Sequence, residues 1–266
     1  MTELTVTARR AVVLPWRTVV ALVPATALGA IALGWPLLAD PDSLAARMAT
    51  ATPWLMALLL PLALLVLLSD LADGGMPATT VALLGALAAV VAIVRPLGGG
   101  VAGLEPVWAV IILAGAVLGP GFGFALGTLG LLTSALLTGG VGPWLPFQMI
   151  IAGWVGCASG IVPWRRLRTG WPRTLGLAAF GAVAALAAGL LLNLWFWPTA
   201  SNLPAVLAFD PTAAPLARLS HLLAFTVATS LPFDLPRAAL TAALLAVATP
   251  TLWSSLERAA RRAHLR

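Results

Sequence analysis

Long apolar stretches, separated by short polar or Gly- and Pro-rich segments, make up nearly the whole chain. A helix that crosses the hydrocarbon core of a membrane needs about 20 mostly apolar residues, and eight stretches reach or approach that length. They lie at residues 18–39, 52–70, 78–94, 106–119, 121–138, 145–163, 174–197 and 236–254. The pattern predicts an all-α integral membrane protein with about eight transmembrane helices.

The basic residues indicate how these stretches are threaded. All 15 are Arg, and eleven of them fall on one side if the eight stretches cross the membrane in order. That side holds Arg9, Arg10, Arg17, Arg165, Arg166, Arg168, Arg173, Arg258, Arg261, Arg262 and Arg266. Cytoplasmic loops retain an excess of positive charge. We therefore expect eight crossings of the plasma membrane with both termini cytoplasmic, because seven or nine crossings would place the C-terminal Arg cluster outside.

Two segments depart from a simple series of crossings. Almost no loop separates the fourth and fifth stretches at Gly119-Pro120-Gly121, and the fourth stretch is short. Because Pro cannot continue a helix and Gly permits a tight reversal, this turn predicts a helical hairpin at the inner face. Residues 214–232 are apolar but contain Arg218 and His221, and the Pro-containing segment 231–236 follows. We expect them to form a helix packed on the outer side, or one dipping partly into the membrane.

Composition divides the chain into two parts and limits its chemistry. Residues 1–75 hold two plain Leu/Ala/Val stretches and are expected to form a two-helix membrane extension, whereas residues 76–266 are denser in Gly, Pro and Trp. Charged residues are only 9% of the chain and the mean hydropathy is +1.01. The few basic residues lie where lipid headgroups would meet them, so the positive net charge does not indicate nucleic-acid binding. One Cys and two His exclude a disulfide framework and make a metal centre improbable, and no cofactor is expected.

Candidate binding residues gather at the outer ends of the predicted helices. The Gly- and Pro-rich segment 136–148 enters the sixth stretch, where Gln148 is a polar amide in an otherwise apolar helix. Such a residue is costly unless partnered and often marks a ligand path, although a Gln bonded to loop carbonyls explains it equally well. Other polar or aromatic groups at the same ends are Arg95, Glu105, Trp108, Trp144, Phe147, Asn193, His221, Asp234 and Arg237. Asp234 and Arg237 lie three residues apart at a helix start and are expected to form a local pair. This distribution indicates a pocket open to the outside.

Small residues line one face of the third stretch. Ala82 and Ala86 are four residues apart, as are Gly85 and Ala89. Faces of this kind let helix backbones approach closely in lipid. From the motif alone, packing within the chain is favoured over docking of a separate membrane subunit.

No catalytic motif is present. The chain has no HExxH, GxSxG or Walker sequence and no paired carboxylates within a predicted membrane helix. We therefore expect the protein not to be an enzyme.

An ordered set of features resembles one transporter family. The alanine face of the third stretch is followed by a Gly-rich outer loop, a short fourth stretch and the Gly/Phe-rich segment 118–127. A Gly- and Pro-rich outer loop, the segment Gly153-Trp154-Val155-Gly156 and an Arg-rich inner loop then follow. This order is similar to that of the substrate-binding (S) component of energy-coupling-factor (ECF) transporters, the vitamin-uptake branch of the ABC transporters. The likeness covers about residues 78–256, which would form the family's six-helix core, and the two extra helices of residues 1–75 depart from the family's basic pattern. The exclusive use of Arg and the Ala/Gly/Leu-rich composition suggest an actinobacterial-type member.

The resemblance implies partners and a mode of action. An S component binds a vitamin or its precursor at the outer face, and topples in the membrane when it docks onto a transmembrane coupling protein driven by two cytoplasmic ATPases. An alanine-rich face of the first core helix contacts the coupling protein in that family, so Ala82, Gly85, Ala86 and Ala89 are assigned to docking. The chain departs from the family's pattern in its long segment between the seventh and eighth stretches, where residues 198–235 would cap the pocket.

The substrate is expected to be a large, partly apolar, ring-bearing molecule, because the outer ends hold many Trp and few charges. A cobalamin-type corrinoid is the first choice and a thiamine-type precursor the second. Gln148 and Asn193 are expected to hydrogen-bond the ligand, Trp144 and Phe147 to stack on it, and Glu105 or His221 to set its polarity. The alternatives are a self-sufficient secondary transporter, a membrane enzyme and a non-catalytic assembly partner. The first should show inverted repeats, and no convincing repeat is visible.

Overall fold

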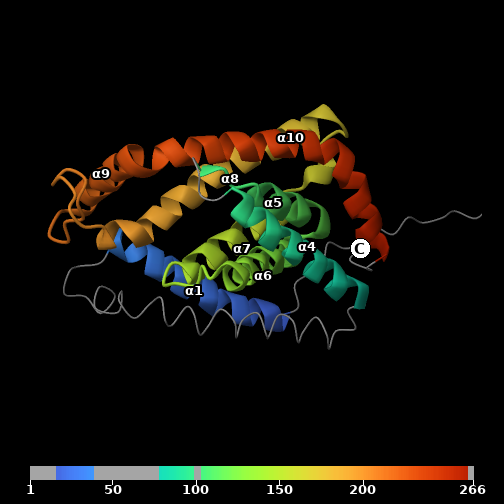
Figure 1. Cartoon of the computed structure of the whole chain (residues 1–266), viewed down its shortest axis with the longest axis horizontal. Helices are drawn as coiled ribbons and strands as arrows, with labels where there is room; N and C mark the ends of the chain where they lie inside the picture. The colour runs from blue at the N-terminus through green and yellow to red at the C-terminus, as the bar shows by residue number, and fades with distance from the viewer. Residues whose placement is uncertain (1–15, 39–77, 99–102, 263–266) are drawn as a thin grey trace, which may run out of the picture.

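A computed structural model describes residues 16–38, 78–98 and 103–262, and these residues form an elongated bundle of helices (Figure 1). No strand occurs in the part of the chain that it describes. The α-helices are α1 (Trp16–Leu38), α4 (Ala78–Leu97), α5 (Val107–Leu118), α6 (Pro120–Thr138), α7 (Leu145–Ile161), α8 (Trp171–Phe196), α9 (Pro215–Phe225) and α10 (Leu231–Arg262). Short 3-10 turns η2 (Trp164–Arg166) and η3 (Trp197–Thr199) flank α8, and the π-helical turn η4 (Thr226–Ser230) joins α9 to α10.

The predicted all-α membrane architecture is confirmed. Five helical segments of the described residues are long and apolar enough to cross a membrane: 78–97, 120–138, 145–166, 171–199 and 215–262. Apolar helices also occupy the first and fourth predicted stretches, and α5 is short, as expected. The second predicted stretch, residues 52–70, lies outside the described residues, so the predicted two-helix extension stays a prediction.

The turn between α5 and α6 has the predicted hairpin geometry. Gly119 adopts φ 105°, a conformation that L side chains rarely adopt, and its N–H closes α5 on the Gly115 carbonyl at 2.9 Å. Pro120 then occupies the first position of α6, where its missing N–H costs no hydrogen bond. The two helices therefore reverse without a loop.

The core of the bundle is built on close backbone contacts between α5, α6 and α7. Gly115 and Gly123 both face Gly156, and a Cβ added to either would meet the Gly156 carbonyl oxygen. Without a hydrophobic force between helices in lipid, small residues permit the close packing that holds a membrane bundle together. The glycine repeat of α5 and α6 thus allows these helices to pack closely against α7.

One helix boundary differs from the prediction. The segment 231–236 was expected to precede the last membrane helix, but α10 begins at Leu231 and continues from α9 through η4 without a break. Pro232 and Pro236 each remove a backbone donor, and the wider π turn immediately before them is the local irregularity that accompanies this loss. The helix beginning at Pro215 therefore runs directly into the last predicted membrane helix.

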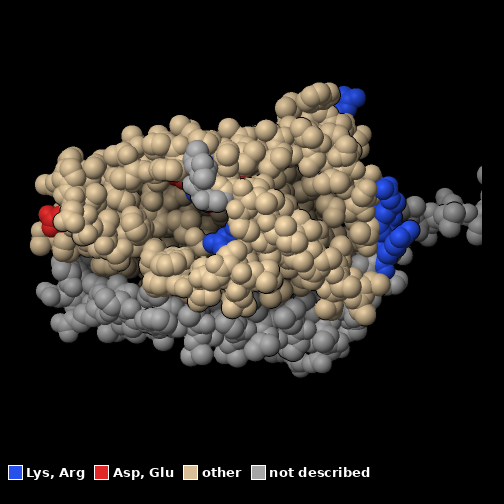
Figure 2. Space-filling model, viewed as in Figure 1, with Lys and Arg blue, Asp and Glu red and all other residues tan. Residues whose placement is uncertain are grey.

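The two ends of the bundle differ in charge. At one end Arg165, in the α7–α8 connection, pairs with Glu257 of α10 at 3.6 Å. The same end holds Arg166, Arg168 and Arg173 beside the last turns of α10 with Arg258, Arg261 and Arg262, and we call it the arginine end. Basic atoms gather there in Figure 2. We call the opposite end, where α1 and α8 finish, the site end.

Candidate ligand site at one end of the bundle

An ion pair across the bundle forms the centre of the site. Glu105 precedes α5, and its carboxylate pairs with the Arg237 guanidinium of α10 at 3.1 Å. The indole N–H of Trp108 donates to the same carboxylate at 2.7 Å. Arg237 also pairs with Asp234, one helical turn earlier in α10, which confirms the predicted local pair. Arg237 therefore lies between two carboxylates from different elements.

Asp234 extends this network to α8. It is buried, with 3% of its surface exposed, and it accepts a hydrogen bond from the Ser230 hydroxyl at 2.8 Å. The Asn193 side-chain amide of α8 donates to Ser230 at 2.7 Å and to Thr226 at 3.1 Å. Buried polar groups are stable only when hydrogen-bonded, and this chain of contacts satisfies Asp234 from two sides. The π turn is thereby fixed to α8.

A second polar contact joins α4 to α7. The Arg95 guanidinium, in the last turn of α4, donates to the side-chain amide oxygen (Oε1) of Gln148 at 2.7 Å. Arg95 also interacts electrostatically with Glu105, which links this contact to the ion-pair network. The four ionisable groups, Arg95, Glu105, Asp234 and Arg237, sum to zero net charge.

One face of the molecule is hollowed between its centre and the site end. Figure 2 shows this hollow, with basic atoms and smaller areas of acidic atoms inside it, while most of the surrounding surface carries no charge. Charged groups recessed within an otherwise uncharged membrane surface are typical of a ligand or ion path.

The six residues predicted from the sequence to bind ligand are placed differently by the structure. Glu105, Gln148 and Asn193 belong to the connected polar groups. Trp144 is 41% exposed at the start of α7, whereas Phe147 is only 1% exposed and stacks on Trp195 with a ring-centroid distance of 5.5 Å. His221 lies on α9, where no described contact connects it to Glu105 or Gln148.

His221 instead lies near the connection that follows α8. There Asp210 accepts hydrogen bonds from the side chain and backbone N–H of Thr212, both to the same oxygen. These bonds, chiefly the one from the Thr212 hydroxyl, lower the pKa of the Asp210 carboxyl below its usual value, and His221 adds a smaller electrostatic effect. Asp210 therefore stays ionised over the physiological pH range.

Sequence reasoning named some members of the network without assigning them to the site, and missed others. Arg95, Asp234 and Arg237 were grouped by location only. Ser230 and Thr226 were not singled out. A usable signal was their position four and eight residues before Asp234, one helical turn apart from each other. Hydroxyl residues at such spacing can face one helix neighbour together.

The small-residue face of α4 points away from the bundle. Ala82, Gly85, Ala86 and Ala89 are all exposed, and a Cβ added to Gly85 would meet no atom within 4 Å. The opposite face packs inward, with Val91 against Gly130 of α6. Packing between described helices therefore does not account for the small-residue face.

Comparison with known proteins identifies the family. The model of the family described as "ECF transporter, substrate-specific component" matches residues 77–248, which include α4 to α9 and most of α10. No curated protein and no solved structure gives a significant match to the chain. The matched region contains every residue of the polar network and the exposed face of α4. This multi-pass membrane protein belongs to the family of ECF transporter substrate-specific components.

Proposed function

We propose that this S component captures a vitamin-class molecule at the site end and delivers it for ATP-driven uptake. As a member of its family it is a substrate-binding transport component that works with a transmembrane coupling protein and ATPase subunits. We further propose that two cytoplasmic ATPases drive the complex and that both termini of this chain are cytoplasmic. The arginine end would then face the cytoplasm, in line with the retention of positive charge on that side.

The observation that carries the proposal is the polar network centred on Arg237. It brings together Glu105 before α5, Asp234 on α10 and Asn193 on α8. Arg95, which is hydrogen-bonded to Gln148, also interacts electrostatically with Glu105. Polar groups inside a membrane bundle are expensive, so their gathering at one place supports a ligand site. Partly exposed members, such as Glu105, supply the groups that a ligand would meet.

The charge balance of the site supports a ligand of low net charge. Because Arg95 and Arg237 are matched by Glu105 and Asp234, a strongly charged ligand would leave an unbalanced charge in a poorly solvated place. The exposed indole of Trp144 offers a flat apolar surface for a ring. We favour a cobalamin-type corrinoid, with a thiamine-type precursor as the second candidate.

The exposed face of α4 supports docking onto the coupling protein. Ala82, Gly85, Ala86 and Ala89 present a surface without large side chains, on which another helix could lie at short distance. We propose this face as the contact, and we propose that docking accompanies reorientation of the S component in the membrane.

Mass spectrometry of small molecules released from the purified protein tests the substrate. The protein would be produced in cells grown with supplemented vitamins and purified in a mild detergent, and the molecules released on denaturation would be identified. A stoichiometric corrinoid is the expected result, and a thiamine-type compound would reverse the order of the two candidates. A protein that is repeatedly empty across media would contradict vitamin capture and favour a structural assembly role.

A further inference from the structure

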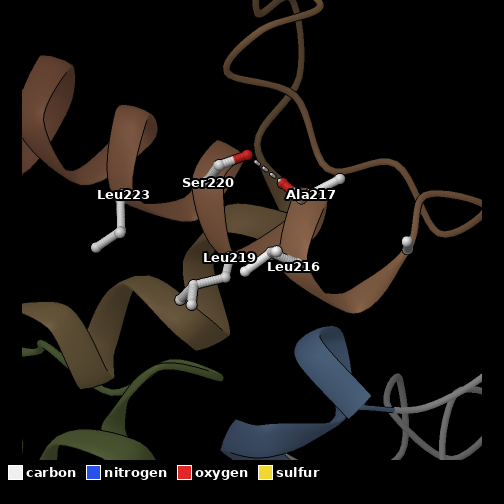
Figure 3. A pocket seen from close by; sticks show the side chains of 6 residues that line it. Leu216, Ala217, Leu219, Ser220 and Leu223 are labelled. Atoms are coloured by element: carbon white, nitrogen blue, oxygen red, sulfur yellow. Dashed lines mark hydrogen bonds between the residues drawn. The ribbon is translucent and has the colours of Figure 1, made fainter.

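The outward face of α9 is apolar along its whole length. Leu216, Leu219, Leu223 and Val227 follow one another at spacings of three or four residues, and each is at least 39% exposed. With Ala214 and Ala217, the three leucines line an open depression of about 490 Å³ (Figure 3). Ser220 also lines it, but its hydroxyl donates to the Ala217 carbonyl of the same helix at 2.7 Å. The face therefore offers almost no polar group to water.

The ionisable residues of α9 are turned away from this face. Arg218 is 5% exposed, and its guanidinium donates to the Ala213 carbonyl at 2.7 Å and to the Pro36 carbonyl of α1 at 3.3 Å. His221 is half-buried. The Arg218 side chain is thus buried on the protein side of α9, and its charge does not lie on the outward face.

The length of α8 indicates the depth of α9. At a rise of about 1.5 Å per residue, Asn193 lies about 30 Å along α8 from Arg173, which belongs to the arginine end. The hydrocarbon core of a bilayer is also about 30 Å thick, so with Arg173 at one boundary Asn193 lies at the other, at the site end.

The last turn of α1 and the residues just after α8 pack on the same aromatic ring. Trp35, one residue before Pro36, and Trp197, four residues after Asn193, both pack on the ring of Phe209, with centroid distances of 5.5 and 5.0 Å. The site ends of α1 and α8 are therefore at the same level.

Both ends of α9 contact this level. Arg218 near its start reaches Pro36, and Thr226 just after its end bonds Asn193. Figure 1 shows α9 beside the ends of α1 and α8, with the connection that follows α8 projecting further from the bundle than α9 does. α9 is therefore held at both ends beside the last turns of α1 and α8.

We propose that α9 is immersed in the lipid at the site end, with Leu216, Leu219, Leu223 and Val227 in contact with acyl chains. The exposed apolar surface continues along α10, where Leu235 and Val247 are 53% and 74% exposed. Residues 215–262 then form one membrane-inserted helix that bends at the π turn, and the connection 197–214 is the aqueous part of the predicted cap. This proposal rests on the membrane location of the chain and not on the identity of its substrate.

Spin labels on single cysteines test the proposal in the full-length protein. The native Cys157 is first replaced by Ala, and Leu219→Cys and Leu223→Cys are then labelled with a nitroxide in phospholipid nanodiscs. Collision with oxygen, which concentrates in lipid, is compared with collision with the water-soluble complex Ni-EDDA by power saturation. Val247→Cys on α10 is the matched lipid control, and Ser201→Cys in the connection after α8 is the water control.

We expect the labels at Leu219 and Leu223 to match the lipid control, with an oxygen-to-nickel collision ratio several-fold above that at Ser201. A ratio equal to that at Ser201 would place α9 in water and overturn the proposal. Low collision with both reagents would mean that protein covers the face, and this result would overturn it as well. If a variant elutes as an aggregate, Leu216→Cys and Val227→Cys repeat the measurement on the same face.

Discussion

Glu105 and Arg237 form an ion pair at 3.1 Å although 132 residues separate them in the sequence. Their pairing joins the start of α5 to the first turns of α10 and places Arg237 between Glu105 and Asp234. The Arg237 side chain is 11% exposed and the Glu105 side chain 30% exposed. The carboxylate on the more open side of the pair is therefore the one that a ligand would reach first.

Replacing Glu105 by Gln is expected to weaken ligand binding about 5- to 150-fold, which corresponds to the roughly 1–3 kcal/mol typical of a charge-assisted contact. The substitution keeps the size of the side chain, and Arg237 retains its pair with Asp234. Binding would be measured by isothermal titration with the ligand found by mass spectrometry. Glu257→Gln is the matched control, because Glu257 pairs with Arg165 at the arginine end. Equal affinities for the two variants and the unmodified protein would remove Glu105 from the site.

The position of Asp234 also depends on a glycine. A Cβ added to Gly189 of α8 would collide with the Asp234 carboxylate, which lies directly against the α8 backbone. Gly189→Ala is expected to lower the free energy of unfolding by about 1–3 kcal/mol, as overpacking of a tight contact does, and to lower the thermal midpoint in detergent. Gly34→Ala in α1 is the control, since a Cβ there meets nothing within 4 Å and the change should be neutral or slightly stabilising. A midpoint unchanged by Gly189→Ala would show that the contact is looser than the structure indicates.

The helices were largely predictable from the sequence because the membrane imposes one rule on every crossing. Backbone groups must be satisfied within the helix, so each crossing appears as an apolar stretch of characteristic length. The reversal at Gly119 and Pro120 could be predicted for the same reason, since both residues have strong conformational preferences. The expected start of the last membrane helix near residue 236 was wrong, because the helix continues from α9 through a π turn and α10 begins at Leu231.

The partners of the polar residues could not be predicted in the same way. Glu105, Asn193, Asp234 and Arg237 were predicted to lie at one side of the membrane. Which of these residues are in contact depends on how α5, α8 and α10 are rotated about their axes. The stacking of Phe147 on the Trp195 ring could not be predicted from the sequence for the same reason. Its aromatic type suggested a ligand contact, whereas its burial depends on the position of Trp195 on another helix.

Phe147 and Trp144 are expected to have separable roles. Phe147 is fully packed against Trp195, so Phe147→Ala should lower the free energy of unfolding by about 3–5 kcal/mol through the cavity that it leaves. Trp144 is 41% exposed, so Trp144→Ala should leave stability within about 1 kcal/mol and weaken ligand binding. Thermal unfolding and titration of both variants check the two effects. The opposite result, a stable Phe147 variant with lost affinity, would return Phe147 to the ligand contacts.

Ala86→Leu on the exposed face of α4 is expected to abolish assembly with the coupling protein while ligand binding by the isolated S component stays unchanged. The larger side chain would project from a surface that relies on small residues for close approach of another helix, and it would touch none of the polar network. Assembly would be measured by co-purification of the tagged S component with the coupling protein and ATPases, and binding by titration of the same preparation. Ala187→Leu, at an exposed position of α8, adds the same bulk to a different surface and should assemble normally. Loss of ligand binding together with assembly in the Ala86 variant would mean that the α4 face supports the fold itself, and normal assembly would move the docking surface elsewhere on the molecule.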